Sequence, residues 1–190
     1  MLDAVGAERA VVVGHDWGAP VAWHTALLRP DRALCGSSGT GPTTTLHVPD
    51  GSGFLDACPE PDALPDWLTE ADLDTFVAEY AERGFTGGLS WYRNHDRNWA
   101  LTAAWRDAKV TVPAAYAAGD RDLVIAGMDF DAVVTTLRRR VPDLRTALHL
   151  PGCGHWTQQE RPAEISALLA DFARWTDRPQ AGVSGRSDGR

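Results

Sequence analysis

A short apolar run that leads directly into a tight turn and a helix constrains this chain most. Ala10–Val13 is rich in valine and free of polar residues, which is typical of a strand covered on both faces in a parallel sheet. The turn Gly14–Gly18 reads Gly-His-Asp-Trp-Gly, and a helical apolar stripe follows it until Pro30. Pro20 falls in the first turn of that helix, where its missing N–H costs little. The sequence therefore predicts half of a βαβ unit.

Asp16 occupies the centre of this G-x-x-x-G turn, at the end of the strand. A serine there would make the nucleophile elbow of an α/β-hydrolase. A serine that attacked an sp³ carbon would form an ether, whereas an aspartate forms an ester that an activated water can hydrolyse. Asp16 therefore points to alkyl transfer followed by ester hydrolysis, with helix capping as its alternative role. We expect Gly14 and Gly18 to be needed because a side chain at either position would meet neighbouring backbone.

An acid and a histidine follow two later predicted strands. Asp120 and Asp122 come after a strand expected over Val110–Ala118, and His155 comes after a strand expected over Leu144–Leu150. The order nucleophile, acid, histidine is that of α/β-hydrolases. The histidine would deprotonate water, and the acid would hold its tautomer and stabilise the imidazolium. Asp120 competes for the acid role, and we favour Asp122.

These segments resemble the epoxide hydrolases of the α/β-hydrolase superfamily. The resemblance rests on the His-Asp-Trp-Gly turn, on Trp91–Asn94 (Trp-Tyr-Arg-Asn) and on the Gly-His-Trp segment near the C-terminus, and it extends to about Trp175. It implies that Asp16 is the nucleophile, His155 the general base and Asp122 the orienting acid.

The resemblance also implies two groups that bind the substrate. Tyr92 matches one of the two cap tyrosines that hydrogen-bond the epoxide oxygen and let it leave as an alcohol. Trp17 follows the nucleophile and would supply one backbone N–H of the oxyanion hole. The expected substrate is a small apolar epoxide, and no metal or organic cofactor is implied.

The chain departs from the family in two places. The family has an earlier half-sheet whose His-Gly-x-Pro loop supplies a second oxyanion donor, and this chain starts just before the elbow strand without that motif. The cap looks shortened between Cys35 and Gly51, and no residue matches the second tyrosine. We therefore expect an N-terminally truncated, partial α/β-hydrolase fold with a reduced helical cap. The elbow strand would have an unpaired edge, which invites self-association.

The sequence divides into four expected parts: the elbow strand and helix (1–38), a reduced cap (39–105), the C-terminal part of the core (106–176) and a disordered tail (177–190). Cys35–Pro65 is rich in Gly and Pro and predicts a loop. Thr69 and Asp72 form a capping-box pattern for a helix that Gly84 ends. The aromatic stretch Leu89–Trp105 predicts a packed, partly buried helix.

Two more helices are expected in the C-terminal part. Val133, Val134 and Leu137 lie on the apolar face of a helix between the two later strands. A last helix is expected over 162–175.

Composition narrows the class of partner. The 190 residues carry 18 Lys and Arg against 26 Asp and Glu, a net charge of −8, so nucleic acid is not an expected partner. The dense cationic cluster Arg138–Arg140 more often decorates the end of a helix. Three cysteines without CxxC spacing indicate a reducing compartment, and no apolar run is long enough to span a membrane. The expected location is the cytoplasm.

The sequence leaves two alternatives open. A haloalkane dehalogenase has a similar Asp, His and acid set but stabilises a departing halide, and Trp17 could be one of its donors. Tyr92 favours the epoxide, because a halide needs no proton. The other alternative is a catalytically inactive fragment, favoured by the missing half-sheet and the reduced cap.

Overall fold

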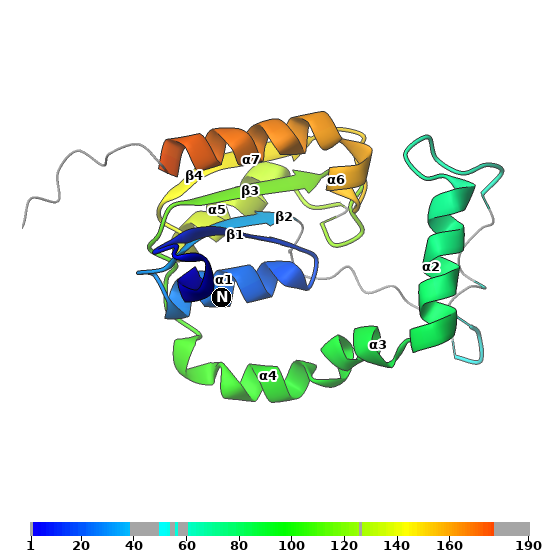
Figure 1. The fold of residues 1–190 in the computed structure, drawn as a ribbon, viewed down its shortest axis with the longest axis horizontal. Helices are drawn as coiled ribbons and strands as arrows, with labels where there is room; N and C mark the ends of the chain where they lie inside the picture. Colours follow the sequence, from blue (N-terminus) through cyan, green and yellow to red (C-terminus); the bar gives the residue numbers. More distant parts are fainter. Residues whose placement is uncertain (1, 39–49, 54–55, 57–60, 126, 177–190) are drawn as a thin grey trace, which may run out of the picture.

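Four parallel strands form the sheet of this chain, for which a computed structural model describes residues 2–38, 50–53, 56, 61–125 and 127–176. The strands β1 (Ala10–His15), β2 (Ala33–Ser38), β3 (Ala114–Gly119) and β4 (Leu144–Leu150) lie in the order β1-β2-β3-β4. All three pairings are parallel, so the carboxyl ends of the strands meet at one edge, on the right in Figure 1. The predicted α/β class is confirmed.

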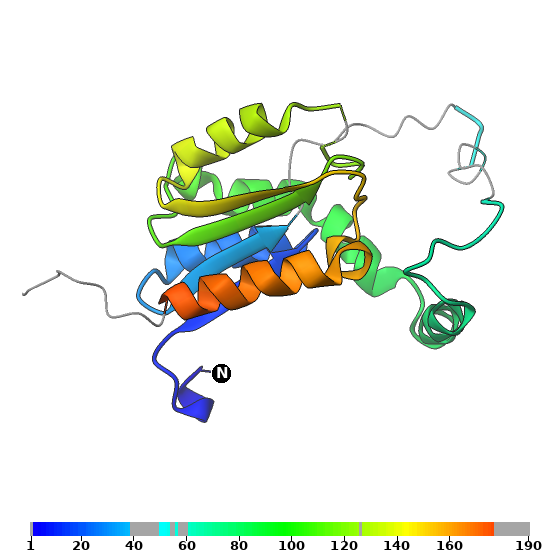
Figure 2. The ribbon, with the colours of Figure 1, turned by 90° about the horizontal axis from the view of Figure 1, so that it is seen from above.

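Helices cover both faces of the sheet. The helices α1 (Gly18–Leu28) and α5 (Phe130–Arg140) lie on one face, and α7 (Pro162–Thr176) lies on the other (Figures 1 and 2). The fully buried strand β3 serves both layers, because its side chains alternate between the faces. Tyr116 belongs to the core cluster that includes residues of α1 and α5, whereas Ala117 packs with Ile165 of α7.

The sequence predicted a loop over Cys35–Pro65, and this prediction is wrong for residues 35–38, which are part of the strand β2. It pairs with β1 through Ala33 and Ala10 and with β3 through Cys35 and Ala114. Its sequence, Ala-Leu-Cys-Gly-Ser-Ser, has little β-branched or aromatic character. Pairing on both sides therefore overrides a weak local preference.

The strand β3 begins later than expected. The prediction placed its start at Val110, but the ladder starts at Ala114. Val110 and Val112 are buried in the core without being part of the strand. Pro113, which has no N–H to donate, separates them from it. The apolar pattern thus identified burial correctly and extended the strand too far.

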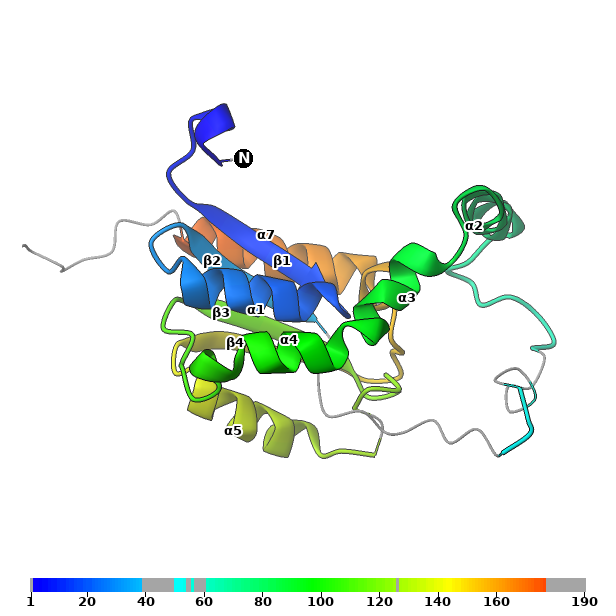
Figure 3. The same cartoon turned by 90° about the horizontal axis from the view of Figure 1, so that it is seen from below.

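The helix α2 (Glu70–Arg83) begins and ends where the sequence predicts. Thr69 Oγ1 accepts the N–H of Asp72 at 3.2 Å, and Asp72 Oδ2 accepts the N–H of Thr69 at 2.9 Å, which completes the capping box. Gly84 ends the helix with a φ of 65°. The helix stands apart from the sheet in Figures 1 and 3, and Phe76 and Val77 on its apolar face are exposed.

The aromatic stretch is helical, but the expectation of one packed, partly buried helix is wrong. It consists of α3 (Thr86–Arg93), α4 (His95–Leu101) and a 3₁₀ turn (Ala103–Trp105), with the break at Asn94. Trp99 is 60% exposed, because α4 runs alongside α1 with no second layer over it in the described structure (Figure 3).

The remaining elements are short or lie at the rim. A 3₁₀ turn (Leu2–Val5) precedes β1, and α6 (Thr157–Glu160) lies between β4 and α7. Arg138–Arg140 occupy the last turn of α5, as predicted. The predicted shortening of the cap falls largely on residues 39–49, and the predicted disordered tail on 177–190, both outside the described residues. Within the described part, no helix is both long and apolar enough to cross a membrane.

Candidate active site

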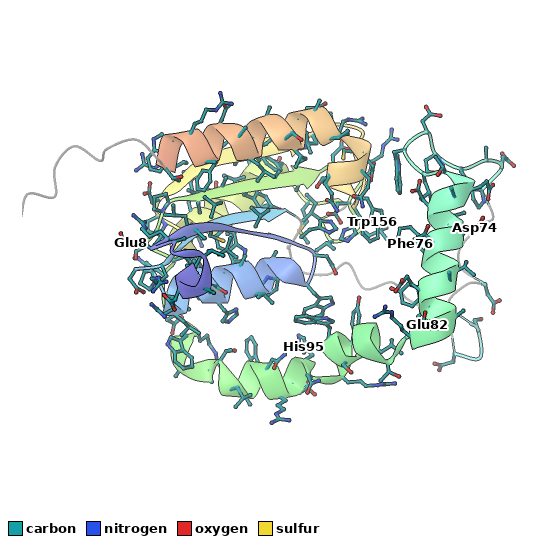
Figure 4. All side chains as sticks on the ribbon, in the orientation of Figure 1. Glu8, Asp74, Phe76, Glu82, His95 and Trp156 are labelled. Carbon is teal, nitrogen blue, oxygen red and sulfur yellow. The ribbon has the colours of Figure 1, made fainter. Side chains whose placement is uncertain are left out.

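Three loops at the carboxyl ends of β1, β3 and β4 bring Asp16, Asp122 and His155 together. His155 Nδ1 lies 3.0 Å from Asp122 Oδ1, and His155 Nε2 lies 3.6 Å from Asp16 Oδ1. The imidazole thus lies between two carboxylates, one on each nitrogen. Trp156, the next residue, lies beyond the ends of the strands in Figure 4.

The turn after β1 holds Asp16 in a strained conformation. Its φ of 50° is the only positive value for a non-glycine residue in the described structure. A Cβ built on Gly14 would lie 2.0 Å from the carbonyl oxygen of Gly18, so that glycine is required. Gly18 does not meet the same expectation, because a Cβ there would meet nothing within 4 Å. Trp17, and not Asp16, occupies the N-cap position of α1, and its side chain makes no capping hydrogen bond.

The structure separates the two candidate acids. Asp122 is fully buried, and its Oδ1 accepts the N–H of Val124 at 2.9 Å in addition to the bond from His155. Asp120 instead accepts the N–H of Gly152 at 2.7 Å, on the loop that carries the histidine. Asp122 therefore contacts the imidazole, and Asp120 braces the loop beneath it.

Electrostatics support a charged pair. The hydrogen bond to Asp122 raises the pKa of His155 above its ordinary 6.5, against the opposing effect of burial, and the nearby charge of Asp16 adds to the rise. Burial alone would raise the pKa of Asp122, but the hydrogen bonds from His155 and Val124 outweigh it and leave this pKa below its ordinary value. The site therefore favours an imidazolium beside a carboxylate.

Comparisons with known proteins show the family of this chain. Residues 1–168 match the model of the alpha/beta hydrolase family. Epoxide hydrolase A of Mycobacterium tuberculosis is 32% identical over an alignment that covers 90% of this chain and 71% of the relative. Epoxide hydrolase 2 of Siraitia grosvenorii is also 32% identical, with 92% and 72% covered. The chain belongs to the epoxide hydrolase family of the α/β-hydrolase superfamily.

Solved epoxide hydrolases share the fold. Epoxide hydrolase A of Mycobacterium thermoresistibile superimposes with a TM-score of 0.80 at 35% identity, covering 91% of this chain and 72% of that one. Potato epoxide hydrolase I gives a TM-score of 0.78 at 30% identity, with 90% and 72% covered. The alignment with the M. tuberculosis relative runs over 232 residues, more than the 190 of this chain. That epoxide hydrolase therefore carries residues inside the matched region that have no counterpart here.

Tyr92, which the sequence assigns to the cap of this chain, lies near the elbow. Tyr92, on α3, meets the Trp17 ring edge-on with ring centroids 5.3 Å apart, and the Trp91 ring stacks on Trp17 at 6.2 Å. The tyrosine is 62% exposed. A groove of about 420 Å³ between α1 and α4 is lined by Trp17, Trp91 and Trp99, among others. It adjoins the elbow, while Asp16 and His155 lie outside its lining.

Two side chains at the site were missed by the sequence analysis. His15 Nε2 donates to the carbonyl oxygen of His155 at 2.8 Å, and the two rings lie 4.6 Å apart. The carboxylate of Glu160 accepts the N–H groups of Gly154 and Trp156. Both contacts go to backbone groups, which leave no side-chain pattern in a sequence.

Neither a metal cluster nor a reactive thiol is found in the described part of the chain. It contains no group of three or more His, Cys, Asp or Glu side chains able to hold a metal ion. Cys35 and Cys153 are free thiols, and burial raises their pKa values to about 12 and about 11. Such thiols stay protonated at neutral pH and are unreactive. Cys58 lies outside the described residues.

Proposed function

We propose that this chain hydrolyses a small apolar epoxide to a vicinal diol through an ester on Asp16. The observation that carries the proposal is the position of His155, with one ring nitrogen 3.0 Å from Asp122 and the other 3.6 Å from Asp16. A base in that position can deliver a water to an ester formed on the same carboxylate. The names of the relatives support the epoxide as the reacting group.

In the first step, Asp16 attacks one epoxide carbon and the carbon–oxygen bond breaks. The elbow supports this role because it presents the carboxylate at the end of β1, beside the N-terminus of α1. The phenol of Tyr92 gives its proton to the departing oxygen, so that the leaving group is an alcohol. The product of this step is a hydroxyalkyl ester and a phenolate.

In the second step, His155 Nε2 takes a proton from water, and the hydroxide adds to the ester carbonyl. The N–H of Trp17 stabilises the resulting oxyanion, and the buried Asp122 stabilises the imidazolium. The intermediate collapses as the imidazolium protonates the leaving diol oxygen. The proton of the regenerated Asp16 carboxyl returns to the phenolate through water, so that epoxide and water together give only the diol.

A variant that stops after the first step tests the proposal. His155→Gln removes the base and should trap the ester, so intact mass spectrometry after incubation with styrene oxide should show one added epoxide mass. Asp16→Asn is the matched control and should gain no mass. An adduct on Asp16→Asn, or epoxide turnover by that variant, would contradict the role of Asp16.

Isotope labelling separates the covalent route from direct attack by water. In a single turnover of the unmodified chain in ¹⁸O-labelled water, the first diol should carry unlabelled oxygen from Asp16. Label in every first-turnover diol would exclude the ester. No diol and no adduct in any variant would instead support the inactive fragment.

We propose that residues 39–105 form a reduced cap between the core parts 1–38 and 106–176. The exposed aromatic side chains of α3 and α4 support this, because a larger cap would bury such side chains. A cytoplasmic location and the absence of nucleic-acid partners stay predictions.

A further inference from the structure

We propose that Glu160 is a positioning residue that holds the general base His155 in its working orientation. The inference rests on the proposed function, because it assumes that His155 is the base. Glu160 would act on the backbone on both sides of that residue and through its charge.

The contacts form a bracket around the histidine. Glu160 Oε2 accepts the N–H of Gly154 at 2.6 Å, and Oε1 accepts the N–H of Trp156 at 3.0 Å. One carboxylate thus binds the N–H of the residue before His155 and the N–H of the residue after it. Hydrogen bonds to an ionised acceptor are among the stronger ones in proteins, so rotation of this short segment is opposed on both sides.

The position of Glu160 is itself fixed by the loop that it holds. The carbonyl oxygen of Trp156 accepts the N–H of Glu160 at 2.8 Å, which closes a ring with the side-chain bond to the N–H of Trp156. A Cβ on Gly154 would lie 2.8 Å from Glu160 Oε1, so a larger residue there would push the carboxylate out of this position. The small residue before the histidine is therefore compatible with this contact.

The charge of Glu160 acts in the same direction as its hydrogen bonds. The ionisable groups in contact with the imidazole are Asp122 after β3 and Asp16 and His15 at the end of β1, and the charge of Glu160 on α6 also acts on it. The bond to Asp122 does most to raise the pKa of His155, and the charge of Glu160 contributes further. A nearby negative charge favours the imidazolium that forms when water loses its proton.

The test compares Glu160→Gln with Glu164→Gln in the full chain. Gln keeps the shape of Glu and removes its charge. Its amide NH₂ group also replaces one of the two oxygens that accept backbone N–H groups, so one hydrogen bond is lost. Glu164 is the matched control, because it is an exposed glutamate in the first turn of α7, four residues after Glu160. An NMR titration of the His155 ring, assigned through its loss in His155→Gln, is read beside single-turnover rates of ester formation and ester hydrolysis.

We expect Glu160→Gln to lower the pKa of His155 and to slow ester hydrolysis by up to about 100-fold, the scale of a 1 Å misplacement. Ester formation should keep its rate, and Glu164→Gln should match the unmodified chain in all readouts. If Glu160→Gln does not fold, Glu160→Asp, which keeps the charge on a shorter arm, should slow hydrolysis while the His155 titration stays close to that of the unmodified chain.

Two results would overturn the inference. One is a Glu160→Gln variant whose His155 titration and ester hydrolysis equal those of Glu164→Gln. The other is an equal loss of both chemical steps with a lower melting temperature and an unchanged titration, which would make Glu160 a stabilising residue only. Because the titration needs no substrate, it tests Glu160 even if the unmodified chain fails to hydrolyse epoxides.

Discussion

The Cα of Gly119 lies so close to the loop that bears the histidine that a Cβ on it would be 2.1 Å from the carbonyl oxygen of Cys153. The same carbonyl accepts the N–H of Arg121 at 2.9 Å. The end of β3 and the segment after β4 are thus joined backbone to backbone. This contact brings together the two segments that carry Asp122 and His155.

Gly119→Ala should therefore damage both stability and the site. The added methyl group must displace backbone, which costs about 1–3 kcal/mol or more in free energy of unfolding. Urea denaturation measures the loss. Gly87→Ala, where a Cβ meets nothing within 4 Å, is the control and should not destabilise the chain. Equal stability of the two variants would mean that the loops separate without cost.

Asp122→Asn should cripple ester hydrolysis more than Asp120→Asn. Of these two acids, only Asp122 contacts the imidazole, and loss of such a carboxylate costs about 10⁴-fold in a comparable triad. Asp120→Asn keeps an oxygen for the N–H of Gly152 and should cost far less. Single-turnover hydrolysis rates of the two variants decide which acid orients His155, and the reverse ranking would assign the role to Asp120.

The rate of ester hydrolysis should rise with pH, and the midpoint of this rise should lie above pH 6.5. The base must be neutral, and Asp122 raises the pKa of His155 above its ordinary 6.5. A raised pKa also means that the pair with Asp122 stabilises the folded state fully below pH 6.5 and loses this contribution as pH rises through the folded pKa. Rates measured from pH 5 to 9 should show that this midpoint moves to lower pH in Asp122→Asn. An unchanged midpoint would mean that a group other than His155 controls the pH dependence.

Tyr92→Phe should slow ester formation from an epoxide by about 10²- to 10⁴-fold, the usual range for a lost general acid. Ester formation from a bromoalkane should not change in this variant, because bromide leaves without a proton. Rapid-quench rates on both substrates provide the comparison. Equal loss on the two substrates would contradict the role of Tyr92 as an acid.

The edge of β1 should mediate self-association. In the described structure β1 pairs only with β2, and Val13 near its end is 53% exposed. Val13→Lys should make the chain more monomeric in analytical ultracentrifugation, because a charge blocks edge-to-edge pairing. Val77→Lys places the same charge on the exposed face of α2 and should leave association unchanged. A reversed pattern would move the contact to α2.

Local sequence was sufficient where a short segment determines its own conformation. The valine run, the G-x-x-x-G turn and Pro20 predicted β1, the elbow and α1, and the capping box predicted the start of α2. The residues of the candidate site were also proposed from the sequence, because nucleophile, acid and base each follow a predicted strand. Parallel strands then place such residues at one edge of the sheet.

Only the tertiary structure decided the rest. The strand β2 has a weak local preference and exists because β1 and β3 pair with it on both sides. Which of Asp120 and Asp122 contacts His155 depends on which carboxylate the loop turns toward the imidazole, and the spacing of side chains in the sequence does not indicate this. Glu160 acts on backbone N–H groups, which every residue except proline carries, so no spacing of side chains could have indicated it.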